Sequence, residues 1–158
     1  MNMVKYEEPL IYQMVQITKK YLSAFASLAK DIPLERYHYA LLLIDEHQEK
    51  LTQKELAKLL QVDKSFMVSM IDYLASNELV CRETNCDDRR QHFLILTEKA
   101  TKIIPMINQV YKSLNKQAFV GIEKDKINQF FEVIKDLQNN LKSIKGHPII
   151  VECKNSNL

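Results

Sequence analysis

The chain has 158 residues, of which 46% are hydrophobic and 27% charged, and its formal net charge is +2. This length supports one domain with a hydrophobic core, or a small domain with an oligomerisation extension. Two glycines and four prolines disfavour a turn-rich all-β protein, and no apolar run approaches the roughly 20 residues that span a bilayer. The near-neutral charge neither requires nor excludes nucleic acid, because a binding face can be basic when the whole protein is not.

The N-terminus and the cysteines indicate a cytoplasmic protein. Glu7 and Glu8 stand where a signal peptide needs an apolar stretch. Cys81, Cys86 and Cys153 fit neither a disulfide framework nor zinc-ligand spacing, so we expect reduced thiols. The four histidines are scattered, and the sequence contains no recognisable Ser/His/Asp set or phosphate-binding glycine loop. We therefore predict no metal, no cofactor and no enzymatic activity.

Two helices are predicted before residue 50. The first covers residues 9–30, and its apolar stripe is broader than a surface helix needs, which indicates burial against a partner as well as against its own domain. Asp31-Ile32-Pro33 ends this helix, because the residue before a proline is pushed out of the helical region. The second helix is predicted over residues 34–46, with inward positions at Tyr37, Ala40, Leu41 and Ile44.

Residues 52–77 have the pattern of two helices joined by a tight turn. Thr52 and Glu55 fit a capping box at the start of a helix over residues 53–60. Asp63 is a good N-cap for a second helix over residues 64–77. The spacing is that of a helix-turn-helix, although the turn lacks the glycine often found there.

The helix over residues 64–77 has two unlike faces. One is an apolar stripe with i, i+3, i+4, i+7 spacing, made of Met67, Met70, Ile71 and Leu74. The other is short and mostly polar, and contains Ser65, Val68, Ser69, Asp72 and Ser76. We predict that this polar face enters the DNA major groove. Phe66 either packs between the helices or contacts a thymine methyl group, and Asn77, which tolerates the left-handed conformation, is the expected C-cap.

A β-hairpin is predicted after this helix, from strands at residues 79–84 and 92–96 with a charged turn between them. Thr97 is expected to cap a helix that runs to about residue 120 with Pro105 inside it, and Gly121 separates it from a last helix over residues 123–144 with near-heptad apolar order. The fold class is therefore mainly α with a small β-hairpin wing: a winged helix-turn-helix lobe plus a helical dimerisation region.

The predicted order of elements divides the chain into four parts. An N-terminal dimerisation helix occupies residues 1–32, and the winged helix-turn-helix lobe occupies residues 33–100. C-terminal dimerisation helices follow at residues 101–145, and residues 146–158 form a tail.

The segment LTQKELAKLLQVDKSFMVSMIDYLASNELV, followed by DDRR and LTEKA, resembles the MarR family of bacterial transcriptional regulators. The match is dense from Leu51 to Ala100. It implies a homodimer whose first and last helices interlock, and a repressor that binds a pseudo-palindromic double-stranded operator. Two positions depart from the family: many members carry arginine where Ser69 stands and glycine where Glu78 stands.

The resemblance assigns the DNA-binding residues. The wing motif Asp-x-Arg falls on Asp88 and Arg90, so Arg90 is expected in the minor groove, supported by Asp88, with Arg89 as an extra cation. The positions nearest the bases are Lys64, Ser65, Val68 and Ser69. Candidate phosphate contacts are Lys54, Lys58 and Arg82, each of which is otherwise a routine surface charge.

Other interpretations remain open on the sequence alone. The wing arginines can pair with Asp87 and Asp88 on a solvated loop, and a winged helix can bind protein instead of DNA. Cys86, near two arginines, is the one cysteine that fits a redox switch. Five aromatic residues either line a cleft for a small aromatic or lipophilic effector, as is common in the family, or belong to the core: Tyr12, Tyr21, Phe25, Tyr37 and Tyr39.

Overall fold

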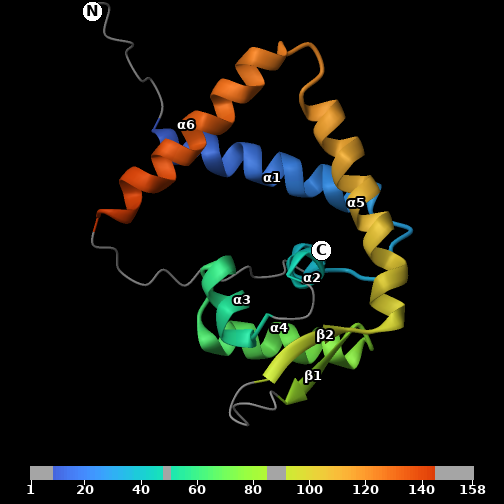
Figure 1. Cartoon of the computed structure of the whole chain (residues 1–158). Helices are drawn as coiled ribbons and strands as arrows, with labels where there is room; N and C mark the ends of the chain where they lie inside the picture. Colours follow the sequence, from blue (N-terminus) through green and yellow to red (C-terminus); the bar gives the residue numbers. More distant parts are fainter. Residues whose placement is uncertain (1–8, 48–50, 85–91, 145–158) are drawn as a thin grey trace, which may run out of the picture. The chain divides into compact units, whose positions relative to one another are not determined.

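The computed structural model describes residues 9–47, 51–84 and 92–144. It forms two compact units, Met1–Ala118 and Phe119–Leu158. The predicted fold class, mainly helical with a two-stranded hairpin, is confirmed (Figure 1). The elements are α1 (Leu10–Leu28), α2 (His38–Glu46), α3 (Gln53–Leu60), α4 (Lys64–Ser76), β1 (Val80–Thr84), β2 (His92–Leu96), α5 (Glu98–Ala118) and α6 (Lys124–Lys142).

Helix α2 begins four residues later than the sequence predicts. Residue Tyr37 has φ 68°, in the left-handed region, so the helix cannot extend back through it. The preceding connection is a series of turns, in which the Ile32 amide donates to the Ala29 carbonyl at 3.0 Å. The side chains of Ile32 and Leu34 are buried. The predicted inward positions Ala40, Leu41 and Ile44 are buried and Tyr37 is half-buried, but the predicted helix over residues 34–37 was wrong.

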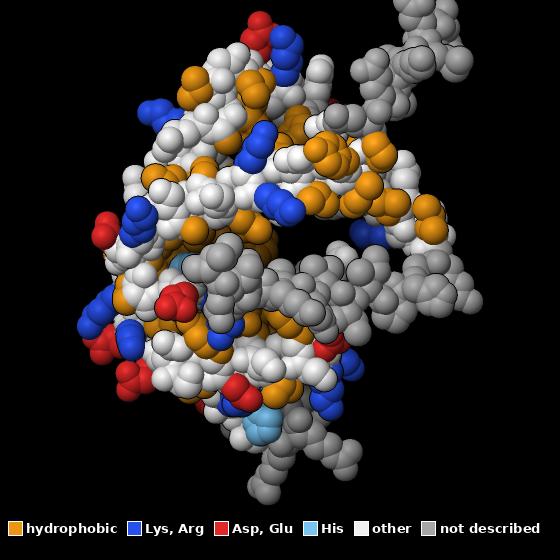
Figure 2. Space-filling model, turned by 180° about the vertical axis from the view of Figure 1, so that it is seen from behind, with side chains coloured by type: hydrophobic (Ala, Val, Ile, Leu, Met, Phe, Trp, Pro, Cys, Tyr) orange, Lys and Arg blue, Asp and Glu red, His pale blue; other side chains and the backbone are white. Residues whose placement is uncertain are grey.

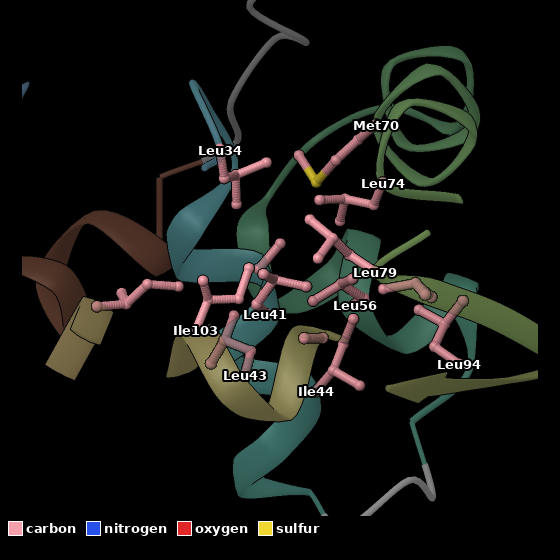
Figure 3. Close-up of a cluster of buried hydrophobic side chains, with 14 of the residues drawn as sticks. Leu34, Leu41, Leu43, Ile44, Leu56, Met70, Leu74, Leu79, Leu94 and Ile103 are labelled. Carbon is pink, nitrogen blue, oxygen red and sulfur yellow. The ribbon is translucent and has the colours of Figure 1, made fainter. Parts of the chain in front are cut away.

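The core of the first unit lies where α2, α3, α4, α5 and the hairpin meet (Figure 3). Its largest fully buried side chains are Leu41, Ile44, Leu56, Met67, Ile71, Leu74, Leu79, Leu94 and Ile107. The strands pair antiparallel, with Val80 opposite Leu96 and Thr84 opposite His92. Segment 51–52 pairs with the other edge of β2, because the Leu94 amide donates to the Leu51 carbonyl at 2.9 Å. This pairing ties the start of α3 to the hairpin.

Helix α5 follows the hairpin directly. Its N-cap is Thr97, as predicted, because the Thr97 Oγ1 accepts a hydrogen bond from the Ala100 amide at 3.2 Å. The helix continues through Pro105 and packs against α1 and α2. In the second unit, Gly121 has φ 75° and separates α5 from α6 as expected.

Helices α1 and α6 carry many exposed hydrophobic side chains. They include Leu10, Ile11, Ile17 and Leu22 on α1, and Phe130, Phe131, Val133 and Leu141 on α6, with exposed fractions from 43 to 66%. Hydrophobic side chains are prominent on the surface drawn in Figure 2. Across the described parts of the chain, no helix is both long and apolar enough to cross a membrane.

Candidate nucleic-acid interface

The start of α3 has the predicted capping box. The Thr52 Oγ1 accepts from the Glu55 amide at 3.3 Å, while the Glu55 carboxylate accepts from the Thr52 amide at 2.8 Å. The Thr52 amide and the Thr52 hydroxyl, which donates at 2.7 Å, both stabilise the ionised Glu55 carboxylate and so lower the pKa of Glu55. The capping-box hydrogen bonds satisfy amides that the first turn of a helix leaves unpaired, and so fix where α3 begins.

The turn between α3 and α4 closes without a glycine. Gln61 has φ 53°, in the left-handed region. The Val62 amide donates to the Ala57 carbonyl at 3.0 Å and the Gln61 amide to the Lys58 carbonyl at 3.3 Å, which is the hydrogen-bond pattern of a Schellman motif. Asp63 then caps α4 as predicted, accepting from the Phe66 amide at 2.8 Å. The turn therefore closes between the two helices although it contains no glycine.

Helix α4 is held by one face and free on the other. The predicted inward stripe of Met67, Met70, Ile71 and Leu74 is buried. The side chains of Lys64, Ser65, Val68 and Ser69 are exposed on the helix surface. The Ser69 hydroxyl donates to the Ser65 carbonyl of its own helix at 3.1 Å, so the oxygen keeps both lone pairs as acceptors.

The C-terminal end of α4 differs from the prediction. Asn77 has φ −89°, so it is not the left-handed residue. That conformation falls on Glu78, with φ 58°. The Leu79 amide donates to the Leu74 carbonyl and the Glu78 amide to the Ala75 carbonyl, each at 2.9 Å, which makes a second Schellman motif. The position where the family often has glycine is thus one that requires a positive φ.

The base of the hairpin is joined to α4 by an ion pair. A guanidinium nitrogen of Arg82 on β1 lies 2.6 Å from the Asp72 carboxylate on α4. The sequence suggested Arg82 as a phosphate contact and Asp72 only as an outward polar residue. Residues of opposite charge ten positions apart carry no local pattern, so only the fold brings the pair together. The pair links β1 to α4 at the protein surface, beside the buried Leu79 and Val80.

The remaining DNA-binding candidates lie on α3 or outside the described residues. Lys54 and Lys58 are exposed on α3, and no ion pair holds either of them within the described residues. The wing-tip candidates Asp88, Arg89 and Arg90, together with Cys86, fall in residues 85–91, which lie outside the described residues.

The five aromatic candidates occupy different environments. Phe25 is buried, and its ring lies 4.6 Å from that of Tyr111 on α5. The half-buried Tyr21 donates from its hydroxyl to the Asn115 Oδ1 at 2.7 Å. Tyr12 and Tyr39 are half exposed. Burial, together with nearby Tyr21 and Tyr39, raises the pKa of Tyr111 to about 12, and burial also raises the pKa of Tyr21.

Tyr37 stands apart from the other aromatic candidates, because its ring contacts α4. The ring centroids of Tyr37 and Phe66 are 6.1 Å apart, and those of Tyr37 and Tyr73 are 5.4 Å apart. This contact bears on the two interpretations of Phe66: the side chain packs against Tyr37 while 39% of its surface stays exposed. The sequence held no sign of this contact.

Comparison with solved structures supports the same architecture. The transcriptional repressor CouR, solved bound to a 23-mer DNA duplex, aligns with a TM-score of 0.76 at 21% identity, over 87% of this chain and 98% of CouR. MepR of S. aureus, solved as a DNA complex, aligns with a TM-score of 0.78 at 17% identity, over 85% of this chain and 99% of MepR. The apo form of MarR from E. coli aligns with a TM-score of 0.67 at 21% identity, over 82% of this chain and 97% of MarR.

These likenesses establish the fold, and a family model matches part of the sequence. The MarR family model matches residues 34–92. This range covers α2, the helix-turn-helix and β1, and it ends at the first residue of β2. The resemblance stated from the residues is thereby confirmed over this range, where the chain matches the MarR family of transcriptional regulators.

Proposed function

We propose that the chain is a sequence-specific, double-stranded DNA-binding transcriptional regulator that acts as a cytoplasmic homodimer, most simply as a repressor. The observation that carries this proposal is the contrast between the two faces of α4. Four buried side chains anchor one face, and the other presents Lys64 and the short side chains of Ser65, Val68 and Ser69. A helix anchored in this way can approach the base edges of a major groove without steric obstruction.

The exposed groups on α4 suit that role chemically. Serine hydroxyls can donate or accept at base edges and phosphates, and lysine can meet guanine or phosphate oxygens. The Ser69 oxygen is available as an acceptor for a base amino group. Lys54 and Lys58 on α3 are free to meet phosphates beside the groove. CouR and MepR, which share the fold, were solved with DNA.

The wing completes the interface in this proposal. The Asp72–Arg82 ion pair fixes the base of the hairpin against α4. Arg90, supported by Asp88 and accompanied by Arg89, then extends into the adjacent minor groove, whose narrow form attracts arginine. Arg82 acts mainly as a support for the wing, with phosphate contact as its second role.

The exposed apolar surfaces of α1 and α6 support a homodimer. Side chains such as Ile11, Ile17 and Phe131 are more than half exposed, and apolar surface of this extent marks an interaction site. Two-fold symmetry matches a pseudo-palindromic operator with half-sites roughly 10 bp apart. A small aromatic or lipophilic effector near Tyr12, Tyr21, Phe25, Tyr37 and Tyr39 would release DNA by changing the spacing of the two lobes.

Fluorescence anisotropy with the gene's own upstream DNA tests the proposal. Titration at several salt concentrations should give a log K that falls linearly with log salt, because phosphate contacts release counterions. Arg90→Ala and Ser65→Ala should weaken binding to the upstream duplex, each by about 1–3 kcal/mol if the residue reads a base edge. Lys116→Ala, an exposed change on α5, is the charge control and should leave binding unchanged.

The same titration separates the competing functions. Absence of duplex binding at low salt would reject the DNA-binding proposal and favour a winged-helix module that binds protein. If peroxide releases the wild-type protein from DNA but not Cys86→Ser, the regulator is a thiol switch. Equal release of both removes that alternative.

A further inference from the structure

A cluster of four side chains joins the connection between α1 and α2 to the flank of α4. The Arg36 guanidinium carbon lies 4.2 Å from the ring centroid of Tyr73 and 5.3 Å from that of Tyr37. The Tyr37 ring makes edge contacts with both Tyr73 and Phe66, at interplanar angles of 80° and 90°. These distances are within the range of attractive cation–π and edge-to-face contacts.

The backbone at the centre of this cluster is in an unfavourable conformation. Tyr37 has φ 68° and ψ 21°, a left-handed conformation that is disfavoured for residues with a Cβ. Such conformations persist where the surrounding structure holds them, and they concentrate at functional sites. Here the ring of Tyr37 is held on α4.

His38, the residue after Tyr37, anchors the same connection to the core. His38 is buried, its Nε2 donates to the Leu34 carbonyl at 2.8 Å, and its ring meets Phe25 of α1 at 5.0 Å. Tyr37 and His38 therefore face opposite partners, α4 and the α1 side of the core. The left-handed conformation at Tyr37 is what turns the chain between them.

The two α4 members of the cluster occupy one side of the helix. Phe66 and Tyr73 are seven residues apart, which is two turns, so they share a face. At 100° per residue this face lies about a quarter-turn from the buried stripe and about a quarter-turn from the exposed serines. A contact on this flank resists rotation of α4 about its own axis. Burial of a single apolar stripe resists the same rotation less well.

We propose that Arg36 and Tyr37 are positioning residues, which set the rotation of the recognition helix α4 by holding its Phe66–Tyr73 flank from the α1–α2 connection. The proposal rests on the DNA-binding function proposed above. Rotation of α4 would move Ser65 and Ser69 away from base edges, while phosphate contacts made by flexible lysines would adapt. Loss of the cluster should therefore weaken specific binding more than non-specific binding.

A double-mutant cycle on Arg36 and Tyr73 tests this inference. Arg36→Ala and Tyr73→Leu should each weaken operator binding by about three- to tenfold, the factor that one cation–π or aromatic contact of this kind is worth. The double variant should lose little more than the larger single loss, because both changes remove one contact. Binding to an unrelated duplex should stay unchanged, as should the salt slope of operator binding.

Conservative variants and a charge control accompany the cycle. Tyr73→Phe keeps the ring and should bind the operator like wild type. Lys30→Ala removes a positive charge from the same connection without touching the cluster, and should also bind like wild type. If Tyr73→Leu fails to fold by circular dichroism, the comparison of Arg36→Gln with Arg36→Lys decides the same question, with the larger loss expected for glutamine.

Three results would overturn the inference. Additive losses in the double variant would show that the two residues act separately. A salt slope lowered by about one in Arg36→Ala would identify a direct phosphate contact instead. Wild-type affinity in every variant would leave the cluster without a role in binding. By contrast, a wild-type protein that binds no duplex at all would reject the DNA-binding function itself, and the inference with it.

Discussion

Replacing Glu78 by glycine should stabilise the fold, because Glu78 occupies a left-handed position with φ 58°. A Cβ in this conformation costs about 1–2 kcal/mol. Against this gain, glycine adds unfolded-state entropy worth about 0.4–1 kcal/mol. The substitution also removes the Glu78–Lys99 ion pair, 3.4 Å long and with side chains 82% and 49% exposed, and such a surface pair contributes only about 0–0.5 kcal/mol.

Comparison with alanine isolates the backbone effect. Glu78→Ala loses the same ion pair but keeps the Cβ, so Glu78→Gly should be the more stable of the two by about 0.8 kcal/mol, the middle of a range of about 0–1.6 kcal/mol. For a chain of this size, 1 kcal/mol corresponds to a change of about 2–4 °C in Tm. Urea and thermal unfolding followed by circular dichroism measure both variants on the same scale.

The neighbouring residue provides a control of opposite sign. Asn77 has φ −89° and its side-chain amide donates to the Tyr73 carbonyl at 2.8 Å. Asn77→Gly should therefore destabilise, since it relieves no strain and removes a hydrogen bond. Equal stability of Glu78→Gly and Glu78→Ala, or a stabilised Asn77→Gly, would refute the conclusion that the left-handed conformation lies at residue 78.

Two further predictions concern the capping box and the core. Hydrogen bonds from the Thr52 amide and hydroxyl lower the pKa of Glu55 in the folded protein. The ionised carboxylate therefore stabilises the fold at any pH above the pKa that Glu55 has in the unfolded chain, about 4.3. This stabilisation is lost as the pH falls through the lower pKa of the folded state. Thr52→Ala should cost about 1 kcal/mol at pH 7 and reduce the loss of stability between pH 5 and 3; an unchanged acid profile in urea titrations would contradict this. Leu74→Ala, at a fully buried position of α4, should cost about 2–5 kcal/mol, whereas Ser76→Ala on the exposed side should stay within about 0.5 kcal/mol. Equal costs for the last two would mean that the faces of α4 are wrongly assigned.

Features whose causes are local could be predicted from the amino-acid sequence. The capping box at Thr52, the N-caps at Asp63 and Thr97, and the buried stripe of α4 were all predicted at the residues where the structure has them. Each depends on side chains within one or two turns of the helix concerned, so its pattern is complete in a short stretch of sequence. The match to the family model, from residue 34 to residue 92, includes Thr52, Asp63 and α4 but not Thr97.

Three unusual backbone conformations could not be predicted, because they depend on tertiary packing and not on a local sequence pattern. Tyr37, Gln61 and Glu78 all have positive φ although none is glycine. Intrinsic preference argues against this conformation at each of them. At Gln61 and Glu78 the left-handed conformation belongs to a Schellman motif that ends a helix. At Tyr37 it belongs to a connection that is held between the core and α4. The late start of α2 has the same origin.

Contacts between side chains that are distant in the sequence also depend on the packing of separate elements. Asp72 pairs with Arg82, and Arg36 with Tyr73, across 10 and 37 residues respectively. Their spacings follow no helical or strand period, because the contacts depend on how separate elements pack. Periodicity along a chain reports which face of a helix is buried, whereas the rotation of α4 and the direction of the wing depend on contacts between elements, which only the folded chain brings together.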